Sequence, residues 1–390
     1  MPPPASPPLA RERARPLRLL HIHSDFDPGG SQLRTVRLIR RFGPACAHSI
    51  VSRVPEAMGA ADAIGRGVPV LQLNLPDLDG RPSLRRGRAL AEAMRGYDLV
   101  LTYDWGAINA VLAHTVFGPS LGLPPLVHHE DTLDAAESER PRRRRNALRM
   151  LALARAQALV AGSRGLETLA LTAWQQPREK VHRISGGIDT RAYARKPARD
   201  ALPRLIKRPG ELWLGTLGRL APARNLRRLV RAFAALPEPW QLVIVGEGPE
   251  RDAVAAEATR LGLADRVHLP GHVAEPAKAI GLFDLFALGS DREQFPYPVI
   301  EAMAAGLAVA SPAVGDVAAV VGPGNGGFVT PPGDEAALAD ALARLAADPA
   351  RRRAIGAENQ AKARAEFDEV EMTERYARLY AKVMRRPHFP

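Results

Sequence analysis

The stretch Glu293–Glu301, which reads EQFPYPVIE, places a carboxylate at each end of a short segment. Pro296 and Pro298 lack amide donors, so a single helix cannot run through both acids. We therefore expect the first acid on a loop and the second in the first turn of a helix that begins at Pro298. Gly306 is placed to end that helix.

This pair of carboxylates suits a ligand that is both polyhydroxylated and anionic. Carboxylates accept hydrogen bonds from sugar hydroxyls, whereas a helix N-terminus and free loop amides favour phosphate. The amides of Gln294, Phe295 and Tyr297 remain available in the predicted loop.

The length and composition indicate a two-domain globular protein. The chain has 390 residues, of which 46% are apolar, and no apolar run approaches the roughly 18 residues that a membrane span needs. The proline-rich start, MPPPASPP, lacks the apolar core of a signal peptide, and we expect a disordered tail over residues 1–15. The single cysteine, Cys46, cannot form an internal disulfide, which favours a cytoplasmic location.

Basic residues concentrate in the first half of the chain. The net charge is +12; residues 1–200 hold 30 Lys and Arg against 19 Asp and Glu, and residues 201–390 hold 24 against 23. A basic face attracts an anionic membrane, an anionic substrate or nucleic acid. The arginine run at 140–145 is either a solvated helix start or a contact with membrane or acceptor. No aromatic residues interleave with it, which argues against a nucleic-acid platform.

Short apolar strands alternate with helical patterns, which predicts parallel sheets covered by helices on both faces. In the first half, strands are expected at 17–22, 47–51, 68–71, 99–102, 126–128 and 158–160, with helices at 31–41, 85–95, 142–156 and 163–173. In the second half, strands are expected at 212–217, 241–245, 267–269, 285–288 and 308–310, with helices at 226–235, 250–261, 299–305 and 335–347.

The pattern divides the chain into two Rossmann-like α/β domains with a cleft at the carboxyl ends of their strands. We expect an N-terminal domain over 16–195 and a C-terminal domain over 205–368, joined by a loose stretch near 193–209. A last helical segment within 369–390 could pack against either domain.

Two glycines, Gly29 and Gly30, follow the first predicted strand and precede a helix. Glycine lets the backbone approach a ligand closely, and the helix N-terminus favours anions. The alternative is a plain turn in which Ser31 caps the helix. The motif is not GxGxxG, so it does not support a nicotinamide site.

Two arginines, Arg219 and Arg224, follow the first strand of the second half, directly after Gly218. Their guanidinium forks suit a diphosphate, and each charge-assisted contact contributes roughly 1.5–3 kcal/mol. The alternative is a pair of solvated surface arginines. A later strand ends near Val273, whose loop could hold a nucleotide base through backbone contacts.

Four polar residues, His128, His129, Glu130 and Asp131, end a predicted strand of the first half. Buried polar groups are costly unless they are solvated or functional. The four could contact substrate, serve structure or bind a metal. Adjacent histidines point to opposite sides of a strand, and no HExxH spacing or cysteine pair supports zinc, so we expect no metal site.

Taken together, these motifs resemble the retaining GT-B glycosyltransferases of family 4. The likeness covers most of the chain, and its motifs keep their order. They are the glycine loop at 29–30, the polar strand tip at 128–131, GGID at 186–189, GRL at 218–220, VGEG at 245–248, and the Glu-x7-Glu block at 293–301 followed by AMAAG.

The resemblance implies two Rossmann-like domains with a nucleotide-sugar in the cleft. Glu301 would hold the ribose hydroxyls, and Arg219 and Arg224 would hold the diphosphate and stabilise its charge as it leaves. Glu293 and the amides of Gln294 and Phe295 would face the donor sugar.

The remaining site residues follow from the same resemblance. Gly30 would let the acceptor domain close on the phosphates, and Gly218 and Val273 would lie at the donor. His128–Asp131 would meet the acceptor or the sugar, with His129 and Asp131 as catalytic candidates. No obligate metal or cofactor is implied, because arginines and a helix N-terminus take its place. Retention is attributed to same-face attack, in which the leaving phosphate assists deprotonation of the acceptor hydroxyl.

The chain departs from the family pattern at several positions. Arg224 stands where a lysine is usual, Gln294 where a glycine is usual, and Asp131 near the place of a usual histidine. Gly186 stands where an asparagine is usual. The loop at 313–316 lacks the Gly-Gly-x-x-Glu often seen in the family, and Asp316 is a partial substitute for its acidic residue.

We therefore expect a retaining glycosyltransferase that moves a sugar from a UDP- or GDP-linked donor to a lipid-linked or envelope glycan acceptor. Its partners would be the donor, the acceptor and an anionic membrane surface on the inner face of the plasma membrane, without nucleic acid. Alternatives are a GT-B isomerase or phosphorylase, and a basic nucleic-acid-binding protein that would leave Glu293 and Glu301 without a role.

Overall fold

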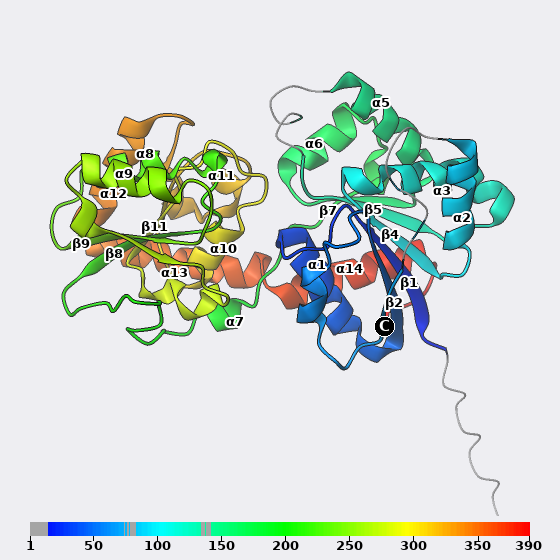
Figure 1. Ribbon diagram of the computed structural model, residues 1–390, viewed down its shortest axis with the longest axis horizontal. Coiled ribbons are helices and arrows are strands. Elements are labelled where there is room, and N and C mark those ends of the chain that lie inside the picture. The colour runs from blue at the N-terminus through cyan, green and yellow to red at the C-terminus, as the bar shows by residue number, and fades with distance from the viewer. Residues whose placement is uncertain (1–14, 74, 76–77, 79–82, 134–136, 138–141) are drawn as a thin grey trace, which may run out of the picture.

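Two parallel α/β domains lie side by side, which confirms the predicted fold class (Figure 1). The computed structural model describes residues 15–73, 75, 78, 83–133, 137 and 142–390. Residues 1–14 of the expected tail and Arg140 of the basic run lie outside this part.

The N-terminal domain is built on a seven-stranded parallel sheet in the order β3-β2-β1-β4-β5-β6-β7. Its strands are β1 (Leu17–His23), β2 (Cys46–Ser52), β3 (Val70–Gln72), β4 (Leu99–Tyr103), β5 (Leu126–Glu130), β6 (Ala158–Ala161) and β7 (Val181–Arg183). Its helices are α1 (Gly30–Phe42), α2 (Leu84–Met94), α3 (Ile108–Leu121), α5 (Arg143–Ala152) and α6 (Arg164–Thr172). The short helix α7 (Thr190–Tyr193) follows in sequence but packs on the C-terminal domain (Figure 1).

The C-terminal domain repeats the arrangement with six parallel strands in the order β10-β9-β8-β11-β12-β13. The strands are β8 (Leu212–Leu217), β9 (Trp240–Val245), β10 (Val267–Gly271), β11 (Leu285–Ala287), β12 (Val309–Pro312) and β13 (Val329–Thr330). The helices are α8 (Leu226–Phe233), α9 (Arg251–Arg260), α10 (Tyr297–Ala304), α11 (Val317–Val320), α12 (Glu335–Ala347) and α13 (Pro349–Glu366), and α14 (Glu369–Val383) follows them in sequence.

The central strands are buried on both faces, which explains their apolar sequences. All five residues of β4, LVLTY, are buried, and the same holds for LVHHE in β5. A parallel sheet covered by helices on both sides selects such runs. The two histidines and the glutamate of β5 break this rule and therefore need partners inside the protein.

The last helix, α14, packs on the N-terminal sheet beside α1, although it follows the C-terminal domain in sequence (Figure 1). Tyr376, Tyr380 and Leu379 of α14 share one apolar cluster with Leu19 and Leu101 of the sheet. The chain thus crosses between the domains twice, and the two crossings lie side by side. The Ile188 amide donates to the Phe367 carbonyl at 2.9 Å, and the Glu369 amide donates to the Ile188 carbonyl at 2.9 Å.

The helix after the acidic loop starts one residue earlier than predicted. α10 begins at Tyr297 with Pro298 as its second residue, so Glu301 lies beyond the first turn. Proline suits this position because its missing amide would be unpaired there anyway. Gly306 follows the helix with φ of 78°, a conformation that favours glycine.

Candidate functional site

The cleft forms where the strand order of each sheet reverses direction. In the N-terminal sheet this point lies between β1 and β4, and in the C-terminal sheet between β8 and β11. At such a point the loops that follow the two neighbouring strands run to opposite faces of the sheet. A crevice opens between them at the carboxyl ends of the strands. Ser24 and Asp104 follow β1 and β4, while Arg219 and the loop with Glu293 follow β8 and β11.

A cavity of about 870 Å³ is lined by residues of both domains. Among the predicted site residues, six line it: Gly30, Asp131, Arg224, Glu293, Gln294 and Phe295. Other lining residues were not predicted, and they include Ser24, Asp25, Arg34 and Asp104. Tyr297, of which only the backbone amide was predicted to be available, also lines the cavity.

Arg224 and Glu293 form an ion pair at the C-terminal wall of this cavity. The Ser290 hydroxyl donates to the same carboxylate oxygen of Glu293 at 2.9 Å. Burial raises the pKa of Glu293, and the charge of Arg224 partly offsets the rise. The pair places a cation and an acceptor oxygen together, which suits a phosphate next to a sugar hydroxyl.

Glu301 lies behind the cavity wall, on α10. Its Oε1 accepts a hydrogen bond from the Tyr193 hydroxyl at 2.9 Å, and its buried Oε2 has no partner within the described part of the chain. Burial raises the pKa of Glu301 to about 7. A buried acceptor without a partner is costly, so this oxygen is suited to receive a ligand hydroxyl.

Arg219, Gly218 and Val273 lie outside the main cavity. Gly218 and Arg219 line a smaller hollow that also includes Arg224, so the two arginines remain neighbours. Arg219 is exposed, and Val273 is half-buried against the apolar core of the C-terminal domain.

His128, His129 and Glu130 are placed differently from our expectation, because all three are buried and none lines the cavity. His128 contacts the Thr102 hydroxyl at 2.9 Å and Glu130 at 2.9 Å. His129 points the opposite way, with Nδ1 3.1 Å from the Thr102 carbonyl and Nε2 3.1 Å from the Tyr380 hydroxyl. Each polar atom meets a protein partner, so the position of these residues does not favour substrate contact.

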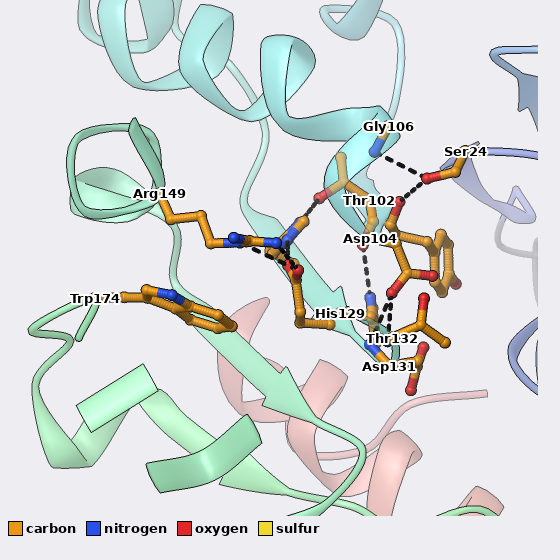
Figure 2. Close-up of polar contacts among 12 residues, drawn as sticks. Ser24, Thr102, Asp104, Gly106, His129, Asp131, Thr132, Arg149 and Trp174 are labelled. Carbon is orange, nitrogen blue, oxygen red and sulfur yellow. Dashed lines mark hydrogen bonds and ion pairs between the residues drawn. The ribbon is translucent and has the colours of Figure 1, made fainter. Parts of the chain in front are cut away.

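Arg149 balances the buried carboxylate of Glu130 (Figure 2). Its Nη2 lies 2.6 Å from Glu130 and its guanidinium stacks over Trp174 at 4.8 Å. Burial acts to raise the pKa of Glu130, yet Arg149 and His128 hold it below its usual value. Burial keeps the pKa of His129 well below its usual value, so its ring is neutral at physiological pH.

Asp131 reaches the cavity, where it pairs with Arg34 of α1. Arg34 directs both terminal guanidinium nitrogens at the carboxylate, with Nη2 2.5 Å from Oδ2. The Arg34 side chain is only 1% exposed and also lies over the Tyr376 ring at 5.5 Å. A bidentate pair of this kind fixes the carboxylate and neutralises its charge.

Asp104 stands at the end of β4, beside the Arg34–Asp131 pair. Its Oδ1 accepts the amides of Asp131 at 2.8 Å and Thr132 at 2.9 Å (Figure 2). Burial, together with the nearby charges of Asp131 and Glu130, raises the pKa of Asp104 to about 8.

Tyr297 connects the two domains at the cavity. Its hydroxyl donates to the Gly30 carbonyl at 3.3 Å. A Cβ atom at Gly30 would lie 2.5 Å from the Tyr297 ring, and one at Gly186 would overlap its hydroxyl. Gln294 adds a second bridge, donating from Nε2 to the Leu133 carbonyl at 3.1 Å.

Asp316 provides a third contact between the domains. Its Oδ2 accepts the Arg164 amide at 2.8 Å and so lies at the N-terminus of α6, in the other domain. A carboxylate is favoured there by the unpaired amides and the helix dipole. Asp316, which we expected to substitute partly for a missing acidic residue, thus joins the two domains in the structure.

Asp104 could have been found from the sequence by the reasoning that selected Asp131, because both follow a buried strand directly. The side chains of Arg34 and Tyr297 carry no such signal. Arg34 lies within a basic amphipathic helix, and Tyr297 lies between two prolines.

The described residues contain no cluster of three or more side chains suited to a metal ion. None of the described helices combines the length and apolarity that crossing a membrane requires.

Two family models match adjacent parts of the chain. The model described as Glycosyltransferase Family 4 matches residues 28–192, and Glycosyl transferases group 1 matches residues 201–362. Together they take in both walls of the cavity. The chain belongs to glycosyltransferase family 4.

Individual relatives share part of their length with this family 4 member. N-acetyl-alpha-D-glucosaminyl L-malate synthase of Bacillus anthracis is 24% identical over 54% of this chain and 56% of its own. GDP-mannose-dependent alpha-mannosyltransferase of Mycobacterium tuberculosis is 32% identical over 43% of each chain. The matches thus span about half of these relatives. Among solved structures, Anabaena HepE in complex with UDP has a TM-score of 0.79 and 22% identity, covering 94% of this chain and 100% of that one.

Proposed function

We propose that the protein transfers a sugar from a UDP- or GDP-linked donor to a hydroxyl of an acceptor glycan, with retention at the anomeric carbon and without a metal. The proposal rests on one observation above all. Glu301 has a buried Oε2 without a partner in the described part of the chain, and the charge of the nearby Arg224 acts on its pKa. Arg224 in turn pairs with Glu293 at the wall of the interdomain cavity.

The donor contacts follow from the chemistry of that wall. Glu301 accepts the ribose hydroxyls, and Arg224 exchanges Glu293 for the diphosphate, assisted by Arg219. Glu293, once released, accepts a hydroxyl of the donor sugar beside Gln294. The arginines supply the positive charge that stabilises the leaving diphosphate, so that no metal is needed.

We further propose that the acceptor is lipid-linked or part of an envelope glycan, and that the N-terminal domain meets an anionic membrane. Helices α2, α3 and α5 form one layer of that domain (Figure 1). Leu84, Leu151 and Val116 on these helices are 78%, 59% and 51% exposed. Exposed arginines surround them on α2 and α5, and such a mixture suits anionic lipid. Relatives of Rhizobium meliloti are named for lipopolysaccharide core biosynthesis, which also supports this acceptor class.

A thermal-shift panel of UDP, GDP, ADP and CMP with their sugar conjugates tests the donor proposal. A ligand that binds the folded state raises the melting midpoint, and we expect UDP or GDP to do so without added metal. Arg224→Ala and Glu301→Ala should weaken that response. The matched control is Arg208→Ala, an exposed arginine of the same domain outside the cleft. Unchanged affinity in both cleft variants would refute the site.

A further inference from the structure

Carboxyl groups outnumber basic groups on the N-terminal wall of the cavity. Among the described lining residues of this wall, Asp25, Asp104 and Asp131 are acidic and Arg34 is basic. Arg34 is already engaged with Asp131 in the bidentate pair. Within the described part of the chain, no basic side chain forms an ion pair with Asp25 or Asp104. The wall therefore presents two carboxyl groups to a ligand without a matching cation.

These two carboxyl groups belong to neighbouring strand ends. β1 and β4 pair in parallel, and Asp25 and Asp104 follow them at the same edge of the sheet. The Ser24 hydroxyl joins the two segments, because it donates to the Tyr103 carbonyl at 3.3 Å and accepts the Gly106 amide at 2.9 Å (Figure 2). One ligand group in the cavity can therefore meet both acids.

The surroundings hold one oxygen of Asp104 and leave the other for a ligand. Asp104 is only 8% exposed, and its Oδ1 accepts the amides of Asp131 and Thr132. Oδ2 has no hydrogen-bond partner within the described part of the chain. Across the cavity, Gln294 is held through Nε2 by the Leu133 carbonyl, and its buried Oε1 has no partner among the described residues. A buried oxygen without a partner is costly, and a ligand that donates hydrogen bonds relieves this cost.

The charges around Asp104 favour a positive ligand group. Burial, together with the charges of Asp131 and Glu130 of β5, raises the pKa of Asp104 to about 8. The cations of the elements packed around it are engaged elsewhere, Arg34 of α1 with Asp131 and Arg149 of α5 with Glu130. A positive group at Oδ2 would oppose the rise and stabilise the carboxylate.

We propose that Asp25 and Asp104 bind a positively charged amino group of the acceptor, and that the acceptor ring is therefore an amino sugar. This inference rests on the proposed function and specifies the acceptor of the same site. The amino group donates to Oδ2 of Asp104 and pairs with Asp25, which directs a neighbouring hydroxyl of the same ring towards the donor sugar. Asp104 takes no proton from that hydroxyl, because in the proposed retaining reaction the leaving diphosphate assists its deprotonation.

Ligand-observed NMR titrations of the protein with UDP or GDP bound, whichever raises its melting midpoint, test the proposal. The probes are glucosamine, 3-amino-3-deoxyglucose and 6-amino-6-deoxyglucose, each compared with glucose, which carries a hydroxyl in place of the amine. We expect at least one amino sugar to bind about ten- to hundredfold more tightly than glucose at pH 7, because a charge-assisted hydrogen bond replaces a neutral one. This preference should rise between pH 6 and pH 7, because the amine stays charged while a larger fraction of Asp104 is ionised.

Asp25→Asn and Asp104→Asn each remove one charge from the wall. The asparagine Oδ1 still accepts the same hydrogen bonds, and asparagine tolerates the φ of 55° found at Asp104. Each variant should lower the preference about tenfold, and Asp104→Asn should remove its pH dependence. The affinity for UDP or GDP and the melting midpoint should stay near wild type. Asp62→Asn, exposed in the same domain outside the cavity, is the control.

The outcomes separate this inference from the proposed function. A protein that binds UDP or GDP but prefers none of the amino sugars to glucose would overturn the inference and leave the proposed function intact. A preference that survives unchanged in both variants would assign the amino group to another partner and would overturn it as well. If neither nucleotide binds, the proposed function fails, and this inference fails with it.

Discussion

Glu301 shows how burial can prepare one carboxylate for a neutral ligand. One oxygen is held by Tyr193, whereas the other is buried without a partner in the described structure. Its pKa near 7 means that the charged form is only partly populated at neutral pH. Ribose hydroxyls donate hydrogen bonds and therefore bind best to the charged form.

We predict that the affinity for UDP-glucose or GDP-mannose rises about tenfold between pH 6 and pH 8, since binding favours deprotonated Glu301. These diphosphates carry no group that titrates in this range, so the slope reports on the protein. Glu301→Gln should flatten the profile in isothermal titration calorimetry. Tyr193→Phe should move the midpoint to higher pH, because the Tyr193 hydrogen bond lowers the Glu301 pKa. A slope that persists in Glu301→Gln would assign it to another group.

The positions of single residues were predictable where they depend on neighbours in sequence. Glu293 and Asp131 could be placed at the cavity because each follows a strand and faces its carboxyl end. The burial of His129 could not be predicted, because its partner Tyr380 comes from a helix at the far end of the chain. The environment of His129 depends on α14, because this helix covers the face of β5 to which His129 points.

Between elements, α10 reaches across the cleft through its first residue, Tyr297. The ring lies against Gly30 and the hydroxyl against Gly186, where an added Cβ atom would clash with Tyr297 unless the ring moved. The cavity therefore depends on two glycines in the N-terminal domain to admit one aromatic ring from the other.

We predict that Gly186→Ala lowers kcat roughly ten- to hundredfold, because the added methyl group displaces Tyr297 and shifts the two walls of the cleft. The nucleotide Kd should change little, since the proposed nucleotide contacts lie in the C-terminal domain. A double-mutant cycle provides the control. In a Tyr297→Ala background the methyl group has room, so Gly186→Ala should cost little more. Additive losses would mean that the glycine acts independently of the ring.

The regular elements followed from the sequence where periodicity is clear, as in α12, whose predicted bounds match the structure. α3 was missed because its sequence, INAVLAHTVFGPSL, is apolar on nearly all sides and contains Pro119. α13 was missed because its arginines and alanines show little periodicity, and packing against α10 defines it instead.

For the whole molecule, the α2–α3–α5 layer combines exposed arginines with the exposed apolar residues Leu84, Val116 and Leu151. We predict that the protein floats with vesicles containing anionic lipid at low salt, and that added salt releases it. Arg85→Glu combined with Arg144→Glu should weaken binding by about tenfold or more, at roughly 1 kcal/mol or more for each arginine. Arg208→Glu, exposed in the other domain, is the control. Absence of binding by the wild-type protein at low salt would exclude this surface as a membrane contact.

The position of α14 has a consequence for how the protein is made. The N-terminal sheet leaves the ribosome first, but α14, the helix that covers Leu19 and Leu101, follows the C-terminal domain in the chain. Until α14 has been synthesised, one apolar face of that sheet has no cover, and the nascent domain must stay soluble without it. The C-terminal domain can complete its own core earlier, so the domain synthesised second should be the first to reach its final form, and a ribosome stalled before α14 should hold a chain that chaperones still bind.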